Sequence, residues 1–388
     1  MTDAANRYNA LIRKTFDMLY SLCEGQKKTH SDLINLASQL LPITSGTQDV
    51  SQLPEYNDIL KSVVDLYEIE VGIKTYAPNV LAADRQSKYW LYKLKGTTPR
   101  PFFDRYKLYL RQDGFDRKTI DNIEISCEEV LAYCANPRSK VDKKRGLVVG
   151  DVQSGKTANY LGLINLAYDY GYKIVILLAG TTNSLRVQTQ KRTDKGVIGA
   201  KSDSIGNSIE YIGVGFSPRE HYAVPFTNQS NDFAKFIQKN LNAAIADFNK
   251  PVVLVVKKNK SILESVSERL QSELSEQGLD SKSILIIDDE ADNASLNTNK
   301  PEKEPTTINR CIRAILNKFP IASYVGYTAT PFANIFINPN DRDPANLDLF
   351  PSDFIVQLNA PSTYWGGRRV FTGDRETLPL CLREIKED

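Results

Sequence analysis

The chain has 388 residues, of which 41% are hydrophobic and 25% charged, which is ordinary for a globular protein with an apolar core. This length allows two or three domains. The chain has 49 basic and 47 acidic residues, so its net charge is only +2. Overall charge therefore gives no sign of nucleic-acid binding, and only local basic clusters would support it.

Cysteine and histidine usage argues against several kinds of site. The five cysteines form no C-x-x-C pair, which predicts reduced, mostly buried thiols and neither a disulfide framework nor a zinc site. Only two histidines, His30 and His221, are present, which argues against histidine metal sites and Ser-His-Asp hydrolases. No run approaches the ~18 apolar residues of a membrane span, and no signal peptide is evident, so we expect a cytoplasmic protein without membrane contact.

Residues 1–140 are predicted to form a mainly α-helical N-terminal domain. Ser31 is expected to cap its second helix, and Asn136-Pro137 to end its last one. The residues of this region do not point to a particular chemistry. Apolar residues recur at helical spacing in five segments, which are Ala10–Cys23, Ile34–Leu41, Tyr56–Ile69, Phe102–Leu110 and Ile120–Cys134.

Residues 141–360 have an α/β pattern instead. Short apolar runs alternate with helical stretches, which predicts βαβ crossovers and a parallel sheet covered on both faces. Ligands of such sheets bind at the carboxyl ends of the strands. Residues 361–388 are assigned to a tail or to the start of a further lobe. The predicted strands are residues 147–149, 174–178, 211–214, 252–256, 284–287, 324–326 and 354–358.

The segment from Gly150 to Thr157 reads GDVQSGKT and fits the phosphate-binding pattern G-x-x-x-x-G-K-[ST]. It lies between a predicted strand and a predicted helix, which is the context that this pattern requires. Backbone N–H groups of the turn and of the helix N-terminus would hold phosphates. Lys156 would reach the β- and γ-phosphates, and the Thr157 hydroxyl would ligate Mg²⁺. The residues expected to bind ATP are Gly150, Gln153, Ser154, Gly155, Lys156 and Thr157.

Acidic residues follow the predicted strand at residues 284–287. Asp289-Glu290-Ala291-Asp292 spells DEAD, and acids at the end of a buried strand have the layout of a Walker B element. We expect Asp289 to hold Mg²⁺ and Glu290 to orient the attacking water. Asp288 is kept as an alternative metal ligand, although it lies on the opposite face of the strand.

A Thr-Ala-Thr-Pro turn, residues 328–331, follows the predicted strand at 324–326. In superfamily-two helicases a similar Ser/Thr-Ala-Thr element links ATP hydrolysis to strand movement. Thr328 and Thr330 are therefore expected to couple hydrolysis to movement. Alone, such a turn is weak evidence for this function. It becomes strong evidence because it follows the phosphate loop and the DEAD residues in that order along the chain.

Two polar segments are candidates for nucleic-acid contacts, because Arg, Gln and Lys near strand ends suit phosphate and sugar contacts. One begins the helix after the second strand of the α/β region, and the other follows a later strand, so together they would form one basic edge of a strand-binding groove. The alternative for each is a solvated polar face. The residues concerned are Arg186, Gln188, Gln190, Arg192, Lys257 and Lys258.

Four segments in this order resemble the Z-one endonuclease domain family. Members are bacterial, are similar to superfamily-two helicases and accompany restriction and phage-defence genes, often with a partner ATPase of the histidine-kinase type. The resemblance spans about residues 146–360 and implies a RecA-like P-loop domain that uses Mg²⁺ and ATP to act on DNA. The segments are Val149–Tyr160, Gly180–Arg192, Asp288–Ser295 and Gly326–Asn334.

The family pattern has two RecA-like lobes, and the second would supply an arginine that completes the ATP site. Too few residues follow Phe371 for that lobe, so we expect it to come from a missing part of the protein or from a partner subunit. The chain alone is then expected to bind ATP but to hydrolyse it poorly. Asp374, Glu384 and Lys386 match the PD-(D/E)xK nuclease set only as a chance trio would, so we do not expect this chain to cut DNA by itself.

Two other functions stay open on the sequence. A non-catalytic, nucleotide-gated DNA-binding or assembly subunit is favoured by the missing lobe and disfavoured by the Asp289-Glu290 pair. A P-loop kinase for a small molecule would account for the phosphate loop but not for Thr328 and Thr330.

Overall fold

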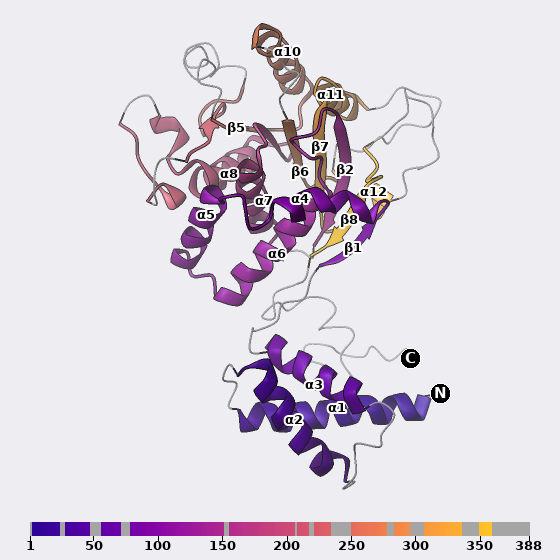
Figure 1. Cartoon of the computed structure of the whole chain (residues 1–388). Helices are drawn as coiled ribbons and strands as arrows, with labels where there is room; N and C mark the ends of the chain where they lie inside the picture. The colour runs from indigo at the N-terminus through magenta and orange to yellow at the C-terminus, as the bar shows by residue number, and fades with distance from the viewer. Residues whose placement is uncertain are drawn as a thin grey trace, which may run out of the picture. The chain divides into compact units, whose positions relative to one another are not determined.

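The computed structural model divides into two compact units, Met1–Tyr76 and Ala77–Asp388 (Figure 1). The boundary differs from the one expected near residue 140, because the helices between residues 89 and 133 pack on the sheet of the second unit. The structure describes residues 2–23, 28–46, 56–70, 78–150, 155–205, 208–216, 221–233, 250–277, 283–293, 295, 306–335 and 349–358.

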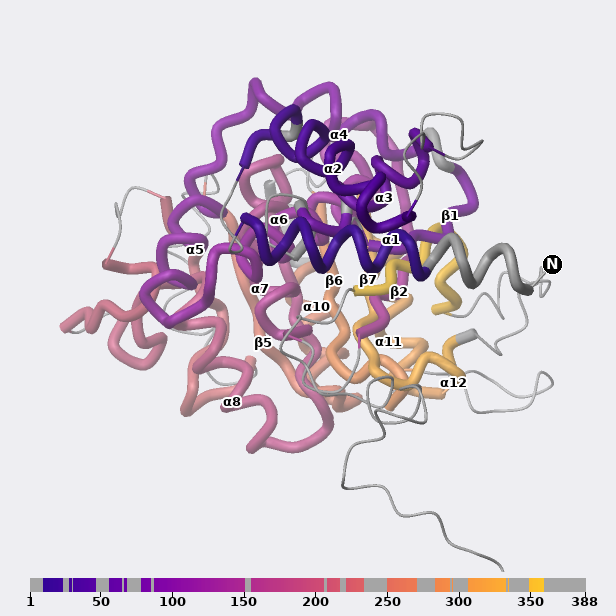
Figure 2. Tube along the Cα trace, turned by 90° about the horizontal axis from the view of Figure 1, so that it is seen from below, coloured from indigo at the N-terminus to yellow at the C-terminus, as the bar shows by residue number. Residues whose placement is uncertain are grey.

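The first unit is a bundle of three helices that share one apolar core (Figure 2). Leu19, Leu33 and Val63, one from each helix, are fully buried in it. Burying a side chain of this size stabilises a fold by about 1.5–3 kcal/mol, so the helical spacing of apolar residues accounts for the bundle. The helices are α1 (Thr2–Leu22), α2 (His30–Ser45) and α3 (Tyr56–Glu70).

The cap of α2 is Thr29 and not Ser31, so the predicted cap was wrong. The Asp32 backbone N–H donates to Thr29 Oγ1 at 3.2 Å, and Thr29 Oγ1 donates to the Asp32 carboxylate at 2.6 Å. Thr29 is extended, whereas Ser31 already lies within the first turn, where a hydroxyl cannot reach the orphan N–H groups.

The second unit is built on an eight-stranded sheet with the order β1-β8-β2-β7-β6-β3-β5-β4. Neighbouring strands are parallel except for β1 and β8, which are antiparallel. The predicted α/β class with a mostly parallel sheet is confirmed. The strands are β1 (Asn79–Ala82), β2 (Asp142–Val149), β3 (Ile174–Ala179), β4 (Val224–Pro225), β5 (Val252–Val256), β6 (Ser283–Asp289), β7 (Ile321–Thr328) and β8 (Phe354–Gln357).

Helices cover both faces of this sheet (Figure 1). Leu285 and Ile287 of β6 join the cluster formed with α4 to α7, whereas Ile284 and Ile286 join the cluster formed with α10 and α11. This alternation follows from the two-residue period of a strand. The helices are α4 (Tyr89–Leu94), α5 (Pro101–Gln112), α6 (Arg117–Tyr133), α7 (Lys156–Tyr170), α8 (Asn183–Thr193), α10 (Lys260–Gln277), α11 (Thr307–Asn317) and α12 (Phe332–Ile335), with the short turns η2 (Arg85–Lys88), η3 (Asp194–Ile198), η4 (Ser202–Ser204) and η5 (Gly213–Phe216).

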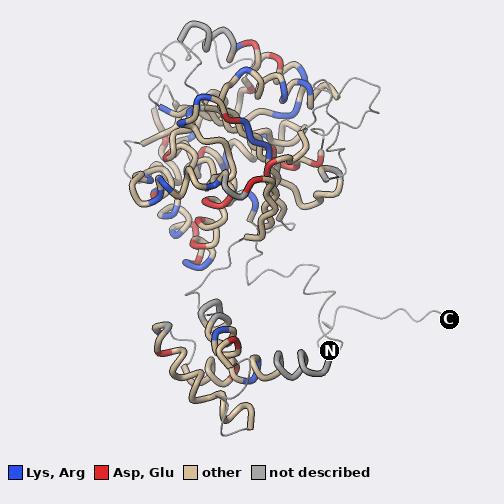
Figure 3. Tube along the Cα trace, turned by 45° about the vertical axis from the view of Figure 1, so that its right-hand side comes forward, with Lys and Arg blue, Asp and Glu red and all other residues tan. Residues whose placement is uncertain are grey.

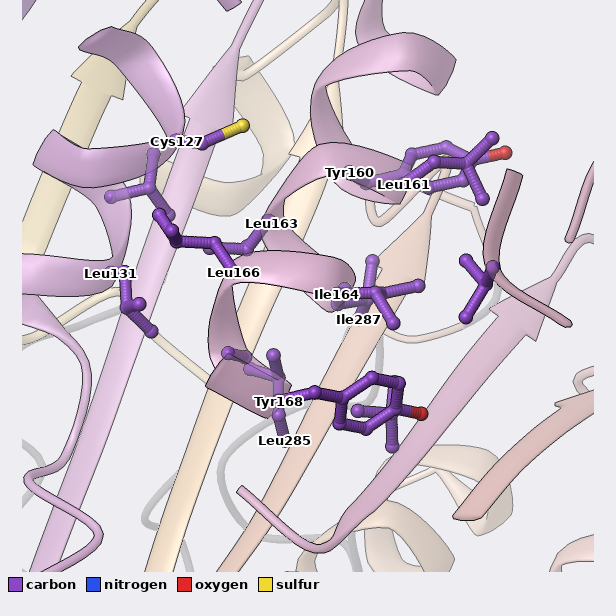
Figure 4. Packing of buried hydrophobic residues seen from close by; sticks show 14 of the residues in the cluster. Cys127, Leu131, Tyr160, Leu161, Leu163, Ile164, Leu166, Tyr168, Leu285 and Ile287 are labelled. Carbon is purple, nitrogen blue, oxygen red and sulfur yellow. The ribbon is translucent and has the colours of Figure 1, made fainter. Parts of the chain in front are cut away.

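Helix α7 is the most enclosed of these helices. Ile164 and Tyr168 lie on its side toward Ile287 and Leu285 of β6, and its other side faces α6 (Figure 4). Because α7 is buried on both sides, its first residue, Lys156, has a fixed place at the edge of the sheet.

The predicted strand at residues 211–214 was wrong. Tyr211 forms only an isolated bridge with Ala200, and η5 begins two residues later. Gly213 has a φ of 53°, and a Cβ there would collide with the carbonyl of Lys195. The glycine therefore lets two loops approach closely, where a strand had been expected.

Four cysteines in the described part of the chain are buried and free, as expected: Cys23, Cys127, Cys134 and Cys311. Among the helices that the structure describes, none combines the length and the apolar character needed to cross a membrane.

Candidate functional site

Three strands bring predicted site residues to one edge of the sheet. Strand β7 lies between β2 and β6, and all three run in the same direction. Val149 pairs with Thr328, and Asp289 pairs with Tyr327. The ends of the three strands, and the loops that follow them, therefore meet at the carboxyl edge of the sheet, where parallel sheets bind ligands.

The described ends of the predicted phosphate segment are held by this edge. The Gly150 N–H donates to the Thr328 carbonyl at 3.1 Å, and Lys156 Nζ donates to the Gly150 carbonyl at 2.9 Å. Gly155 has a φ of 88°, a left-handed conformation that a residue with a Cβ rarely adopts. Gln153 and Ser154 lie outside the described residues.

The N-terminus of α7 has the properties of an anion site. Gly155 precedes this helix of 15 residues, and no side chain caps it. The first N–H groups of a helix lack intrahelical partners and carry partial positive charge, so they can donate hydrogen bonds to the oxygens of a phosphate. Thr157, in the first turn of the helix, is half-buried.

Asp289 lies on the α7 face of the sheet. It continues the odd-numbered side of β6, which packs on α7, and it is partly exposed. Burial, and after it the charge of Glu290, raises the pKa of the Asp289 carboxyl, while Lys258 opposes the rise. An added divalent cation would relieve this crowding of negative charge.

Glu290 is exposed and has a φ of 54°, the one positive φ at a non-glycine residue in the described part of the chain. Such a backbone costs about 1–2 kcal/mol for a residue with a Cβ. Strained residues of this kind concentrate at functional sites, where the surrounding structure holds them.

Asp288 is not an alternative metal ligand, which corrects the expectation from the sequence. Its side chain is fully buried on the α10 and α11 face. One carboxylate oxygen lies 2.8 Å from Lys258 Nζ, and the other accepts a hydrogen bond from the Tyr324 hydroxyl at 2.6 Å. Both oxygens therefore already have partners, on the side of the sheet away from α7.

Lys258 is buried and binds the turn that follows β6, residues 290–293, which we call the acidic turn. The predicted nucleic-acid contact of Lys258 was therefore wrong. Besides its ion pair with Asp288, Lys258 Nζ donates to the carbonyls of Glu290, at 2.6 Å, and Asn293, at 2.9 Å. This buried ammonium therefore holds the backbone within the DEAD residues, at Glu290, and directly after them, at Asn293.

Two further nucleic-acid candidates are interior residues. Arg186 is buried and donates to the carbonyls of Asn228 and Gln229, both at 2.9 Å. Gln190 is fully buried, and its amide donates to Asp194 at 2.9 Å. Both predictions were wrong, because distant loops cover these side chains.

The other three nucleic-acid candidates reach the surface. Gln188 is exposed, and the half-buried Lys257 donates to Asn183 Oδ1 at 2.7 Å. Arg192 is exposed and contacts Thr157 in the first turn of α7. Basic and acidic residues are interspersed along the described trace, so a nucleic-acid surface would depend on local groups such as Gln188 and Lys257 (Figure 3).

Asp292 joins the acidic turn to the Thr-Ala-Thr-Pro turn and was not assigned a role from the sequence. It accepts hydrogen bonds from the hydroxyls of Thr328, at 2.8 Å, and Thr330, at 2.5 Å. The Thr330 N–H also donates to Thr328 Oγ1 at 2.9 Å. The last acid of the DEAD tetrad was the signal that could have found this contact.

The donor set fits Mg²⁺ bound together with a polyphosphate. Among the residues that the structure describes, His, Cys, Asp and Glu form no group of three or more that could hold a metal. Mg²⁺ characteristically takes one or two protein ligands and completes its shell with water and substrate phosphates. Thr157 and Asp289 are residues of the kind that could supply such a pair.

A pocket of about 510 Å³ lies elsewhere, near the start of β2. Asp142 and Lys144 contribute to its lining, with Trp90 and Asn136. It is at the opposite end of β2 from Gly150 and contains none of the predicted site residues.

No protein-family model matches the chain, and a search of curated proteins finds no match. The three tail residues that match the nuclease pattern by chance, Asp374, Glu384 and Lys386, lie outside the described residues.

Proposed function

We propose that this chain is an Mg²⁺–ATP-binding, helicase-like motor domain that acts on DNA in bacterial restriction or phage defence. The proposal adopts the resemblance to the Z-one endonuclease domain family, a cytoplasmic location and a RecA-like core. One observation carries it: Asp292 binds Thr328 and Thr330 at the same strand edge that bears Gly150 and Asp289.

In this proposal the chain's own residues bind and orient the nucleotide. The turn after Gly150, the N-terminus of α7 and Lys156 bind the phosphates. Thr157 and Asp289 would hold Mg²⁺, which would neutralise part of the phosphate charge. Glu290 orients a water molecule toward the γ-phosphate. Its exposed carboxylate at the end of β6 leaves room for that water.

Movement is transmitted through the link between the two turns. Asp292 is two residues from Glu290 and is bound by both threonine hydroxyls, so a displacement of the acidic turn must displace or break the threonine turn. DNA, and a second RecA-like lobe or partner subunit, are the proposed recipients of that movement. The exposed Gln188 and the half-buried Lys257 are the residues proposed to touch DNA.

Phosphate release from ATP tests this function, measured with and without single- and double-stranded DNA for the wild type and Glu290→Gln. We expect slow turnover in the wild type, at least tenfold slower turnover in Glu290→Gln, and equal ATP affinity in both. Equal turnover in the two proteins would contradict the role of Glu290. ATP binding without any turnover would favour the nucleotide-gated assembly subunit, and phosphate transfer to a metabolite would favour a kinase.

A plasmid assay addresses cutting separately. Supercoiled plasmid with Mg²⁺ should stay intact, with and without ATP, if cutting belongs to another lobe or partner. Nicking by the wild type that a mock purification does not reproduce would place a nuclease centre within this chain.

A further inference from the structure

A second cationic side chain reaches the predicted phosphate site. Arg192, at the end of α8, donates a hydrogen bond from Nη1 to Thr157 Oγ1 at 3.3 Å. That hydroxyl is the atom proposed to ligate Mg²⁺. The guanidinium of Arg192 is exposed, so it is in contact with the site and free to turn toward a ligand.

The end of α8 that carries Arg192 is firmly anchored. Asp194, two residues later, is fully buried and accepts hydrogen bonds from Gln190 Nε2 at 2.9 Å, from Ser202 N at 3.1 Å and Oγ at 2.9 Å, and from Gln229 Nε2 at 2.8 Å. This network satisfies the carboxylate and fixes the chain at the turn from α8 into η3.

The same turn is fastened to α7. Asn165, on α7, donates from Nδ2 to the Gly196 carbonyl of η3 at 2.8 Å, and Asn165 is fully buried. Thr157 lies in the first turn of α7 and Arg192 in the last turn of α8, so this hydrogen bond helps to hold the two helices that carry these side chains together. The contact at 3.3 Å is therefore a consequence of packing between two anchored helices.

The charges around Tyr160 agree with this placement. Burial, and after it the charge of Asp289, raises the pKa of the Tyr160 hydroxyl, while Thr157 and the charge of Arg192 oppose the rise. Arg192 and Asp289 therefore act on the same buried side chain of α7 with opposite sign.

We infer that Arg192 binds the γ-phosphate of ATP, so that this chain itself provides an arginine that the two-lobed family pattern would take from a second lobe. The inference rests on the proposed function and reassigns Arg192 from DNA to nucleotide. Lys156 approaches the phosphates from the loop, and Arg192 approaches them from the Thr157 side.

The chemistry follows from the guanidinium group. Its planar fork binds two phosphate oxygens at once and never loses its charge, and a phosphate oxygen is a stronger partner than a neutral hydroxyl. If the Thr157 hydroxyl held Mg²⁺, Arg192 would exchange its contact with that hydroxyl for a contact with the phosphate. ADP has no γ-phosphate, so Arg192 gains this contact only with ATP.

Equilibrium binding of Mg²⁺–ATP and Mg²⁺–ADP to the full chain tests the inference by titration calorimetry. Arg192→Ala should weaken ATP binding by about tenfold to a hundredfold, the range for a hydrogen bond to a charged group, and leave ADP binding within about threefold. Arg192→Lys should recover part of the ATP affinity. Lys191→Ala, the neighbouring exposed residue of the same helix turn, is the matched control and should bind both nucleotides like the wild type.

An unchanged ratio of ATP to ADP affinity in Arg192→Ala would overturn the inference, whether both affinities fall or neither does. Weaker DNA binding with that ratio unchanged would return Arg192 to the DNA surface and overturn it equally. The proposed function fails in a different way: the wild type would then bind neither nucleotide, or Lys156→Ala would bind both normally.

Discussion

The Asp292 carboxylate accepts hydrogen bonds from both Thr328 and Thr330, and so joins the turn after β6 to the turn after β7. The two turns lie on adjacent parallel strands, and the Ala291 N–H also donates to the Tyr327 carbonyl at 3.0 Å. One side chain and one backbone hydrogen bond thus hold together the residues assigned to hydrolysis and those assigned to coupling.

Replacing Thr328 by valine should separate coupling from binding. The shape is kept, but Thr328 loses its hydrogen bond to Asp292 and the one that it accepts from the Thr330 N–H, so the free energy of unfolding should fall by about 2 kcal/mol. ATP affinity should stay the same, and stimulation of turnover by DNA should disappear. Thr328→Ser keeps the hydroxyl and should retain stimulation. Normal stimulation in Thr328→Val, measured by phosphate release, would contradict the coupling role.

Lys258 and Lys257 form a matched pair for a stability test. Lys258→Met leaves Asp288 buried without its cation, so chemical denaturation should show a loss of about 3–5 kcal/mol in the free energy of unfolding. Lys257→Met removes only a hydrogen bond at the surface and should change that free energy by about 0.5 kcal/mol or less. Similar losses in both variants would mean that Lys258 does not hold the acidic turn.

The backbone at Glu290 can be tested with glycine and alanine. Glycine has no Cβ and adopts a φ of 54° without strain, so Glu290→Gly should be more stable than Glu290→Ala by about 1 kcal/mol. At an ordinary position the order is reversed, because glycine loses more entropy on folding. Denaturation curves in which alanine is the more stable variant would show that Glu290 is not strained.

Asp169 should make stability depend on pH. Its carboxylate accepts the N–H groups of Phe102 and Phe103, both at 2.9 Å, yet burial raises its pKa to about 7. An unfolded aspartate has a pKa of about 3.9, so between these values the folded state binds the proton that the unfolded state has lost. The contribution of Asp169 to stability therefore falls as the pH rises from about 4 to about 7.

Asp169→Asn removes this titration. Thermal melting across the same pH range should show a smaller decline for the variant than for the wild type. Parallel curves would indicate that Asp169 titrates normally in the folded protein.

The sequence predicts the central strands well and the edges of the sheet poorly. Buried parallel strands such as β3 and β5 are short, uninterrupted apolar runs rich in Val, Ile and Leu, which is the pattern typical of strands covered on both faces. Strand β1 has no such run: it lies at the edge, and its Leu81 is 72% exposed. Its partner, β8, is far away in sequence, so local pattern gives no sign of the pairing.

The site shows the same contrast. Gly150, Asp289 and Thr328 are brought together because each lies at or just after the end of a parallel strand, and strand ends are visible in sequence. The burial of Arg186 and Lys258 depends on loops and turns about 30 to 40 residues away, which no local pattern contains. A basic residue after a strand is therefore an ambiguous signal until its long-range partners are known.

The measurement that tests the central claim most directly is the shift in melting temperature that Mg²⁺–ATP induces in the wild type, in Lys156→Ala and in Lys191→Ala. At about 100 times its dissociation constant, a ligand stabilises the folded state by about 2.7 kcal/mol. We predict a clear upward shift for the wild type and for Lys191→Ala, and none for Lys156→Ala at the same ATP concentration. An equal shift in all three proteins, or none in the wild type, would contradict nucleotide binding at the carboxyl edge of this sheet.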